Sequence, residues 1–378
     1  MIRVFESFAG VGSQRMALEN IGVEFEVVGI SEVDKNALLS YDIIHNEQVE
    51  VEPKTKQEML QEFEDKHIAY DFSTGKSQVP RKEEDIKRLY DAHIRSKNYG
   101  DIAKINPSDL PDFDFFTYSF PCKNISTAGK QAGLEEGSNT QSSLLWECRK
   151  IIQTKKPKYL LMENVKNLVG KKHKEHFDRW CKELEDLGYT NYWDVLNGKD
   201  YGVPQNRERV IMISILNDTE KTFILPKKAN KPVTSIEDIL DTSNDDFNYL
   251  NKEFIFIKDI PTTKTGKIEH VGKDITTTFC ERQRLVHTNG ITPTAKAMDG
   301  GSTIKILVKN KTNRQVFENR GYVVRYLNPL EFWRLMGYKD EHYYKVKELG
   351  LSKHALYERA GRGIVVPMLE EIFKNLFL

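Results

Sequence analysis

The chain opens with MIRVFESFAGVGSQRMALENIGVEFEVVGISE, residues 1–32, and this stretch decides the fold class. The β-rich run 2–8 predicts a strand, and the glycines of FAGVG directly after it predict a tight turn. Residues 13–20 then follow a helical pattern, and 26–31 form a second apolar run. A strand, a helix and a second strand in this order predict a parallel sheet covered by helices, which is an α/β fold.

The alternation of strand and helix patterns continues to about residue 216, with one interruption. Residues 46–100 contain 10 Lys/Arg and 12 Asp/Glu and few apolar runs, which predicts a charged, mostly helical insertion. A solvated elaboration is the favoured interpretation of this insertion. From about residue 217 the pattern becomes short β-like pieces and polar turns. Helical patterns return at 329–336 and 368–377.

The overall charge excludes a protein that coats nucleic acid indiscriminately. The 378 residues include 56 Lys+Arg and 56 Asp+Glu, so the formal net charge is zero. Residues 258–325 nevertheless contain 13 Lys/Arg and 6 Asp/Glu, which predicts one local basic face. No apolar run has the length of a membrane span, and four cysteines without a CxxC pair disfavour a disulfide scaffold or a bound metal. We expect a cytoplasmic monomer with no membrane or metal partner.

The glycine turn and an acid downstream of it predict a nucleoside site. Gly10 and Gly12 allow a ligand to approach the backbone, and Glu32, 20 residues after Gly12, can accept hydrogen bonds from ribose hydroxyls. The loop is not GxGxxG, so a dinucleotide is disfavoured and a nucleoside without phosphates is favoured. A plain structural turn explains the loop equally well. Asp101, in Gly100-Asp101-Ile102, is a further acid placed to meet an adenine amino group.

Three more groups of residues could carry chemistry, and the first two lie where predicted strands end. Cys122 ends the segment Ser119-Phe120-Pro121-Cys122, where a thiol can act as a nucleophile, although a small buried side chain is the favoured interpretation of Cys122 alone. Glu163 follows the apolar run 159–162. Arg207 and Arg209 have strand spacing, so both guanidiniums could lie beside one carboxylate, although a solvated charge run is an equal alternative.

Taken in order, these segments resemble the motifs of the DNA cytosine-C5 methyltransferases. The matching segments are FAGVG, SEVD, GDI, SFPC, MENV and YGVPQNRER, and then RYLNPLEFWRLMGY (325–338) and GRGIVVPML (361–369). KYLLMENV and SSLLWE are similar to the bacterial subgroup, which comprises restriction-modification enzymes and solitary CpG enzymes. The resemblance covers the chain except 46–99 and most of 217–290.

The resemblance implies an α/β, Rossmann-like S-adenosylmethionine-dependent methyltransferase fold with a smaller, irregular target-recognition domain. It implies methyl transfer to C5 of a flipped cytosine in a specific duplex DNA site. Cys122 matches the nucleophile that adds to C6, and Glu163 the acid that meets N3 and the amino group. Arg209 matches the contact to O2, with Arg207 as its support. The residues that match the S-adenosyl-L-methionine site are Phe8, Ala9, Gly10, Gly12, Glu32, Asp101, Ile102, Pro121, Leu144 and Arg362.

The resemblance also implies the division of the chain. Residues 1–216 and 340–378 would form the catalytic domain, and 217–339 the recognition domain that binds double-stranded DNA. Within 217–339, the candidates for DNA contacts are Thr276–Thr278, Arg282, Gln283 and Arg284, although a solvated basic loop is an equal alternative for each.

Two segments depart from the family pattern. Gln141 and Ser143 stand where the family usually has Arg and Gly, and Arg362 stands where it has Asn beside the cofactor. An arginine at about 4 Å from a sulfonium would be repelled by roughly 4 kcal/mol at an effective dielectric constant of about 20. One hypothesis is that Arg362 selects a carboxylate-bearing donor, carboxy-S-adenosyl-L-methionine, which would make 5-carboxymethylcytosine. A tolerated substitution is the favoured interpretation.

Two other functions remain as alternatives. A non-catalytic DNA-binding relative could mark sites without transferring a group, although Cys122, Glu163 and Arg209 are all present. A tRNA cytosine methyltransferase of the same lineage is the second alternative. The long polar segment after residue 217 favours DNA over tRNA.

Overall fold

The computed structural model describes residues 1–72, 74–121, 144–219, 221–243, 249–250, 254–277, 284–296, 304–309 and 321–378. The chain forms two compact units. Unit 1 comprises Met1–Leu196, Glu208–Pro226 and Ile372–Leu378, and unit 2 comprises Asn197–Arg207 and Lys227–Glu371. Residues 340–371 thus pack in unit 2, whereas we grouped them with residues 1–216. The assignment of catalytic and recognition roles to these parts stays a prediction.

Unit 1 is built on a six-stranded sheet with the order β2-β1-β5-β6-β8-β7. Its strands are β1 (Ile2–Ser7), β2 (Phe25–Ser31), β5 (Phe115–Tyr118), β6 (Tyr159–Val165), β7 (Tyr189–Asn197) and β8 (Glu208–Leu216). The first four in the sheet order pair in parallel, as predicted, but β8 is antiparallel to β6. The sheet is therefore mixed, and the carboxyl ends of its parallel strands meet at one edge.

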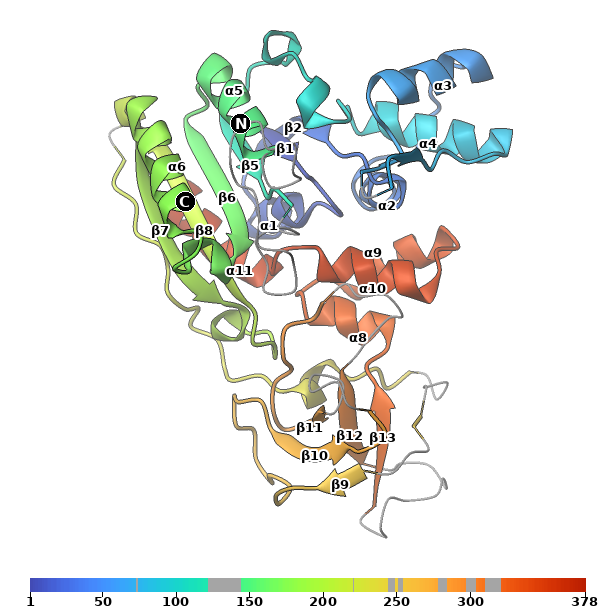
Figure 1. The fold of residues 1–378 in the computed structure, drawn as a ribbon, viewed down its shortest axis with the longest axis vertical. Coiled ribbons are helices and arrows are strands. Elements are labelled where there is room, and N and C mark those ends of the chain that lie inside the picture. Colours follow the sequence, from blue (N-terminus) through green and yellow to red (C-terminus); the bar gives the residue numbers. More distant parts are fainter. Residues whose placement is uncertain are drawn as a thin grey trace. The chain divides into compact units, whose positions relative to one another are not determined.

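Helices cover both faces of this sheet because successive strand residues point to opposite sides. The helices are α1 (Ser13–Ile21), α2 (Lys35–His45), α5 (Leu145–Lys155), α6 (Lys174–Asp186) and α11 (Val366–Phe377). Phe116 of β5 lies in one buried cluster with residues of α5 and α6, which lie together on one side of the sheet (Figure 1). Its neighbour Phe115 packs edge-on against Phe373 and Phe377 of α11.

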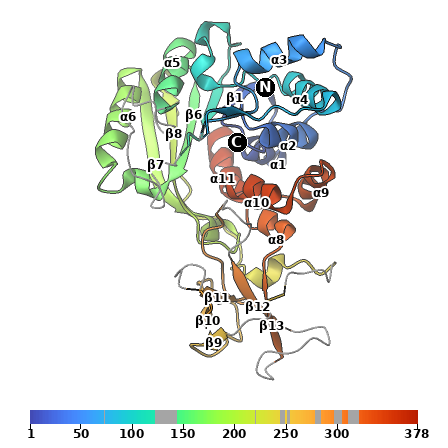
Figure 2. The ribbon, with the colours of Figure 1, turned by 45° about the vertical axis from the view of Figure 1, so that its right-hand side comes forward.

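The charged insertion is mostly helical, as predicted, but it has its own buried core. It contains α3 (Lys56–Asp65), the short hairpin β3 (Tyr70–Asp71) and β4 (Lys76–Ser77), and α4 (Glu83–Arg95). Met59 and Phe63 of α3 and Ile86 and Leu89 of α4 are buried in one cluster with residues of α2. Figure 2 shows α3 and α4 close to α2.

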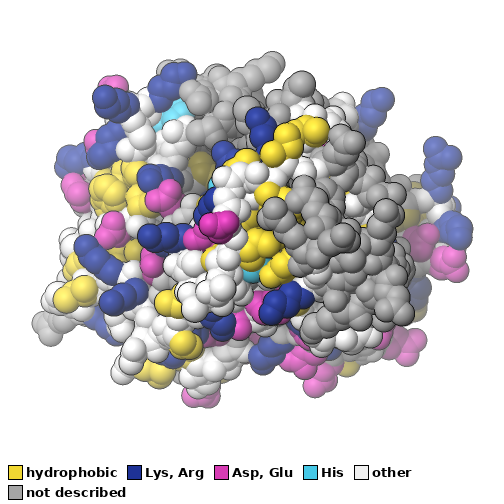
Figure 3. All heavy atoms as spheres, turned by 90° about the horizontal axis from the view of Figure 1, so that it is seen from below, with side chains coloured by type: hydrophobic (Ala, Val, Ile, Leu, Met, Phe, Trp, Pro, Cys, Tyr) yellow, Lys and Arg dark blue, Asp and Glu magenta, His cyan; other side chains and the backbone are white. Residues whose placement is uncertain are grey.

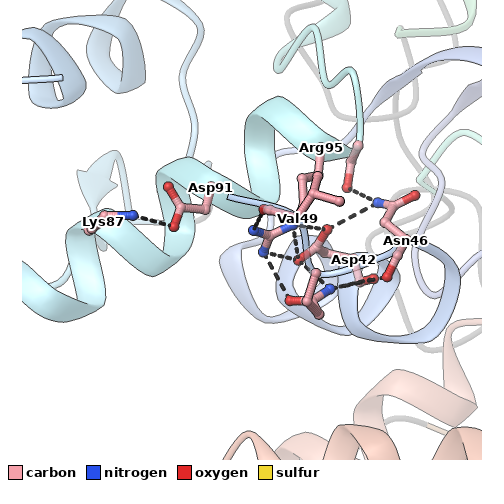
Figure 4. A network of polar contacts seen from close by, with 8 residues as sticks. Asp42, Asn46, Val49, Lys87, Asp91 and Arg95 are labelled. Atoms are coloured by element: carbon pink, nitrogen blue, oxygen red, sulfur yellow. Dashed lines mark hydrogen bonds and ion pairs between the residues drawn. The ribbon is translucent and has the colours of Figure 1, made fainter. Parts of the chain in front are cut away.

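A polar network joins the end of this insertion to α2. The Arg95 guanidinium donates to both oxygens of the buried Asp42, with a shortest distance of 2.6 Å, and to the Val49 carbonyl (Figure 4). Asn46 donates to the same Asp42 carboxylate at 3.1 Å. Because these bonds are charge-assisted and largely shielded from water, they hold α4 against α2. The insertion is therefore an integral part of unit 1 rather than only a solvated elaboration.

Unit 2 contains a five-stranded mixed sheet with the order β13-β12-β11-β10-β9. Its strands are β9 (Phe254–Phe256), β10 (His270–Asp274), β11 (Arg284–His287), β12 (Lys305–Lys309) and β13 (Tyr322–Tyr326), and its helices are α8 (Pro329–Arg334), α9 (Asp340–Glu348) and α10 (Lys353–Gly361). Phe254, Val271, Leu285, Leu307 and Val324 form the core of this sheet. The strands appear where the sequence predicted only β-like pieces.

Short 3-10 helices occur in both units. They span Ile102–Lys104 (η1), Pro107–Asp109 (η2), Lys166–Val169 (η4), Gly198–Tyr201 (η5), Asn217–Thr219 (η6) and Ile236–Ile239 (η7). Among the residues that the structure describes, no helix is long and apolar enough to cross a membrane.

Candidate active site

The predicted glycine turn lies at the carboxyl end of β1 and has a backbone that most side chains would disfavour. Phe8, Gly10 and Gly12 have φ values of 56°, 59° and 78°. Among the residues that the structure describes, a Cβ atom on Gly10 would meet nothing within 4 Å, so the space above this residue is open. A Cβ atom on Gly12 would lie 2.3 Å from Nε2 of His45, so α2 fills the space beside Gly12. The turn therefore leaves room for a ligand at Gly10 and fits tightly against the protein at Gly12.

Glu32 lies at the end of β2 and is oriented by backbone donors. Its Oε2 accepts a hydrogen bond from the Gly10 N–H at 2.9 Å, and its Oε1 accepts from Val33 and Asp34, both at 2.8 Å. The loop after β1 and the acid after β2 are thus directly bonded. This places a fixed carboxylate beside the open position at Gly10, as a nucleoside site needs.

Asp101 lies just beyond a bridge that extends the sheet past β2. Asn98 pairs in parallel with Ile30, and the Asp101 carboxylate follows at the start of η1. Oδ1 accepts from the Ala103 N–H at 3.0 Å, and Oδ2 lies 2.8 Å from Nδ1 of His67. His67 comes from the insertion, and its role could not be predicted from the sequence because a pair 34 residues apart has no local signal.

The remaining predicted cofactor residues of unit 1 differ in exposure. Ala9 is buried with residues of β2 and α2, and Ile102 is buried in the cluster of α5 and α6. Pro121 is half-buried after β5, and Leu144 is half-buried directly before α5. Cys122, Gln141 and Ser143 lie outside the described residues.

Glu163 and Arg209 form the best-defined polar pair of the site. Val165 of β6 is paired with Arg209 of β8, and the Arg209 Nε lies 2.9 Å from Oε1 of Glu163. The hydroxyl of Ser119 donates to Oε2 of Glu163 at 2.7 Å. Because Glu163 is only 7% exposed, these two donors fix its carboxylate in a largely dry place. The sequence pattern predicted no role for Ser119, because its bond to Glu163 joins residues 44 positions apart.

The segment after β5 is also held in place from β6. The side chain of Asn164 donates to the Phe120 carbonyl at 3.1 Å, and its own oxygen accepts from the Val165 N–H at 2.8 Å. The chain leading to Cys122 is therefore anchored next to Glu163 as far as the structure describes it.

Arg207 has a different environment from Arg209. It lies before β8 begins, is buried, and donates to the carbonyls of Ala295, Gly361 and Gly363 at 3.0, 3.1 and 2.9 Å. We predicted that both guanidiniums could lie beside one carboxylate. Arg209 does lie beside Glu163, but Arg207 bonds the turn that contains Arg362. Arg207 therefore supports the 361–363 segment within unit 2.

Arg362 and the predicted DNA contacts lie in unit 2. Arg362 follows α10 and forms an ion pair with Glu358 one turn earlier. Arg284 is exposed at the start of β11, and it pairs across the sheet with the exposed Lys273 of β10. Arg282, Gln283 and Thr278 lie outside the described residues. Within the described ranges, no group of three or more His, Cys, Asp or Glu side chains could hold a metal ion.

Comparison with known proteins assigns the chain to a family. Residues 80–378 match the profile of the C-5 cytosine-specific DNA methylases. The chain belongs to this family. It is 42% identical to the Type II methyltransferase M2.ScrFI of Lactococcus lactis subsp. cremoris, over 100% of the chain and 99% of that protein. It is 33% identical to the orphan methyltransferase M.SssI of Spiroplasma monobiae, over 99% of the chain and 97% of that protein.

The fold agrees with this assignment. The crystal structure of the Dnmt2 methyltransferase of S. pombe superposes with a TM-score of 0.65 at 15% identity, covering 100% of both chains. The predicted family, the Rossmann-like methyltransferase fold and the enzyme class are thereby confirmed: this methylase is a DNA (cytosine-5-)-methyltransferase. Family membership implies S-adenosyl-L-methionine as the methyl donor. The open position at Gly10 and the fixed Glu32 carboxylate fit its nucleoside part.

A buried acid on β1 is connected to the methylase's glycine turn through α2. Glu6 of β1 is fully buried and accepts a hydrogen bond from the Tyr41 hydroxyl at 2.6 Å. Tyr41 and His45 of α2 both lie against Gly12, and Nε2 of His45 is 3.0 Å from the Val11 carbonyl. Burial raises the pKa of Glu6 to about 7, so the protonated form is favoured in the folded protein only below neutral pH.

Replacing Glu6 with glutamine is expected to remove a pH-dependent loss of stability. Because the pKa is raised from 4.5 to about 7, the stabilisation is complete below pH 4.5 and is lost as the pH rises through about 7. The size of this loss is about 3 kcal/mol. Denaturant unfolding at about pH 4.5 and about pH 8 should therefore show a smaller decline for Glu6→Gln than for the wild type. The exposed Glu50→Gln is the control, and equal declines in all three proteins would contradict the prediction.

Proposed function

We propose that this methylase transfers a methyl group from S-adenosyl-L-methionine to C5 of a flipped cytosine in a specific duplex DNA site, through an adduct between Cys122 and C6. The observation that supports this most directly is the buried Glu163–Arg209 pair, with Ser119 on the second carboxylate oxygen three residues before Cys122. This pair provides a fixed carboxylate, Glu163, and a fixed cation, Arg209, beside the chain segment that leads to Cys122.

The chemistry requires activation of a weak nucleophile. The Cys122 thiolate forms a bond to C6, and the electrons of the C5–C6 double bond make C5 nucleophilic. In its protonated form Glu163 would donate a hydrogen bond to N3 and accept one from the amino group, and Arg209 would contact O2, so negative charge that develops in the ring is stabilised. When bound, the sulfonium cofactor supplies the methyl group and leaves as S-adenosylhomocysteine. A base then removes the C5 proton, the S–C6 bond breaks, and Cys122 is released as a thiolate.

The cofactor residues would come from the ends of β1 and β2 and from the segments next to them. Gly10 and Gly12 would let the nucleoside approach, and Phe8 would line the same turn. Glu32 would hold the ribose, while Asp101 and Ile102 would meet the adenine. Pro121 and Leu144 would pack against the cofactor. The hydrogen bond from Gly10 to Glu32 supports this arrangement because it joins two of these residues directly.

The DNA would bind through local cations rather than a uniform basic surface. On the face drawn in Figure 3, Lys and Arg side chains are interspersed with Asp and Glu across the described surface. Lys273 and Arg284 are exposed and directly opposite on β10 and β11. Like charges in this position destabilise a sheet, so an anion between them, such as a DNA phosphate, would relieve the repulsion. The base must leave the duplex because C6 is inaccessible within stacked DNA.

The ion pair of Arg362 supports the ordinary methyl donor. The hypothesis of carboxy-S-adenosyl-L-methionine assumed that the Arg362 charge requires an anion on the donor. Glu358, which also pairs with Arg359 at 3.0 Å, provides an anion one helical turn before Arg362. Transfer of a methyl group, and not a carboxymethyl group, is therefore the proposed reaction.

Trapping on modified nucleic acid tests this proposal. Duplex DNA containing 5-fluorocytosine should form a covalent complex with the wild-type enzyme when S-adenosyl-L-methionine is present, because fluorine at C5 blocks the final elimination. Mass spectrometry of unmodified DNA should then find 5-methylcytosine when S-adenosyl-L-methionine is supplied, and no modified cytosine when only carboxy-S-adenosyl-L-methionine is supplied. A complex only on tRNA would support the tRNA alternative, and no complex on either would support the non-catalytic one. 5-Carboxymethylcytosine would overturn the choice of donor.

A further inference from the structure

The insertion places a short segment against the proposed adenine end of the cofactor site. Between α3 and β4, the N–H of Ala69 donates to the Val33 carbonyl at 2.9 Å, directly after Glu32. The N–H of Asp101 donates to the Lys66 carbonyl at 2.8 Å. Residues 66–69 therefore bridge the two acids that we assign to the ribose and the adenine.

The backbone of this bridge is unusual for its sequence. His67 and Ala69 have φ values of 52° and 57°, a region that residues with a side chain rarely adopt. The approach to Gly100 is also close, because a Cβ atom there would lie 2.3 Å from the Lys66 carbonyl oxygen. Such strained backbone persists where the surrounding structure holds it, and it is frequent at ligand sites.

His67 of the bridge forms an aromatic cluster with two residues that follow the bridge. The His67 ring stacks on Tyr70 with centroids 4.7 Å apart and an interplanar angle of 14°. Phe72 lies edge-on to Tyr70 at 4.9 Å and remains 40% exposed. His67 is thus held from one side by Tyr70, and its Nδ1 points at Oδ2 of Asp101 at 2.8 Å. Since a carboxylate only accepts, Nδ1 must carry the hydrogen.

We propose that His67 is a positioning residue for adenine recognition, an inference that rests on the proposed function. The Nδ1–H of His67 and the Ala103 N–H each bond a different oxygen of Asp101, so the carboxylate cannot rotate. Each oxygen has a second lone pair, and the fixed carboxylate accepts a hydrogen bond from the adenine amino group. The insertion therefore contributes to the choice of the cofactor base, and not only to the stability of unit 1.

Two ligands that differ in the base test this assignment. Isothermal titration calorimetry should compare S-adenosylhomocysteine with S-inosylhomocysteine, in which a carbonyl oxygen replaces the amino group. The wild type should prefer the adenosyl ligand, because a carboxylate repels a second acceptor. His67→Phe retains the ring but loses the donor, so this preference should fall about tenfold. His67→Asn keeps an N–H at the position of Nδ1 and tolerates positive φ, so it should retain the preference.

The outcomes separate a positioning role from a structural one. If His67→Phe weakens both ligands equally, or if His67→Asn loses the preference as fully as His67→Phe, the inference is wrong. Thermal unfolding of both variants shows whether each is folded, so a loss of binding caused by misfolding can be recognised. If both variants are folded, His67→Asn must still prefer the adenosyl ligand, whereas His67→Phe must not. If the wild type binds neither ligand, the proposed cofactor site fails and the role of His67 fails with it.

Discussion

Cys122→Ser is expected to abolish the covalent complex with 5-fluorocytosine DNA and to lower methyl transfer at least about 10⁴-fold. A serine hydroxyl is a far weaker nucleophile than a thiolate, so C6 is not attacked and C5 is not activated. The complex should be scored by denaturing gel electrophoresis, and methyl transfer by incorporation of labelled methyl groups into DNA. Binding of S-adenosylhomocysteine should be unchanged, because the expected defect lies in the chemical step.

Two other cysteines provide matched controls. Cys148 of α5 is fully buried, and burial raises the pKa of its thiol well above the ordinary value. Burial also raises the pKa of Cys181 in α6 to about 12. Neither forms an appreciable thiolate at neutral pH, so Cys148→Ala and Cys181→Ala should still form the complex. A complex that persists in Cys122→Ser, or disappears in Cys181→Ala, would show that Cys122 is not the nucleophile.

Hydrophobic patterns predicted most of unit 1 because the central strands of its sheet are buried on both faces. Six consecutive residues of β8, Val210–Ile215, are buried, and such a run is recognisable in a sequence. β7 was not predicted, because only its first residue and Leu196 are buried and exposed polar residues such as Thr190 interrupt the pattern. Similarly, α9 buries only His342, Tyr343 and Val346 among charged residues. The antiparallel direction of β8 depends on sheet topology, which strand patterns do not specify.

The positions of single acids were easier to predict than the directions of side chains. Glu32 and Glu163 follow from the rule that ligands bind beyond the carboxyl ends of strands. The spacing of Arg207 and Arg209 predicts one shared face only if both belong to a strand, and β8 begins at Glu208. The Arg207 guanidinium instead bonds the 361–363 turn. His67 and Asp101 meet only because the insertion folds back, which a sequence pattern does not encode.

Glu163→Gln is expected to lower kcat about 10²- to 10³-fold while leaving the affinity for DNA nearly unchanged. The two oxygens of Glu163 both face donors, Ser119 at 2.7 Å and Arg209 at 2.9 Å. An amide has only one oxygen, so its NH2 must face one of these donors. Arg209, with a side chain only 14% exposed, would also lose its counter-charge. Single-turnover methyl transfer separates this chemical defect from DNA binding.

Glu208 of the adjacent strand β8 offers a matched control for the loss of a carboxylate. A double variant then distinguishes two causes of the loss of activity in Glu163→Gln. Glu208→Gln removes a carboxylate that is 41% exposed and pairs with Lys166 at 2.8 Å, so its activity should stay within about twofold of the wild type. In Ser119→Ala/Glu163→Gln the amide can turn its NH2 toward the position of the lost hydroxyl. If the loss comes from misorientation, the double variant should recover activity relative to Glu163→Gln. If it comes from the missing carboxylate, activity should stay low, and a Glu163→Gln enzyme of wild-type rate would remove Glu163 from the mechanism.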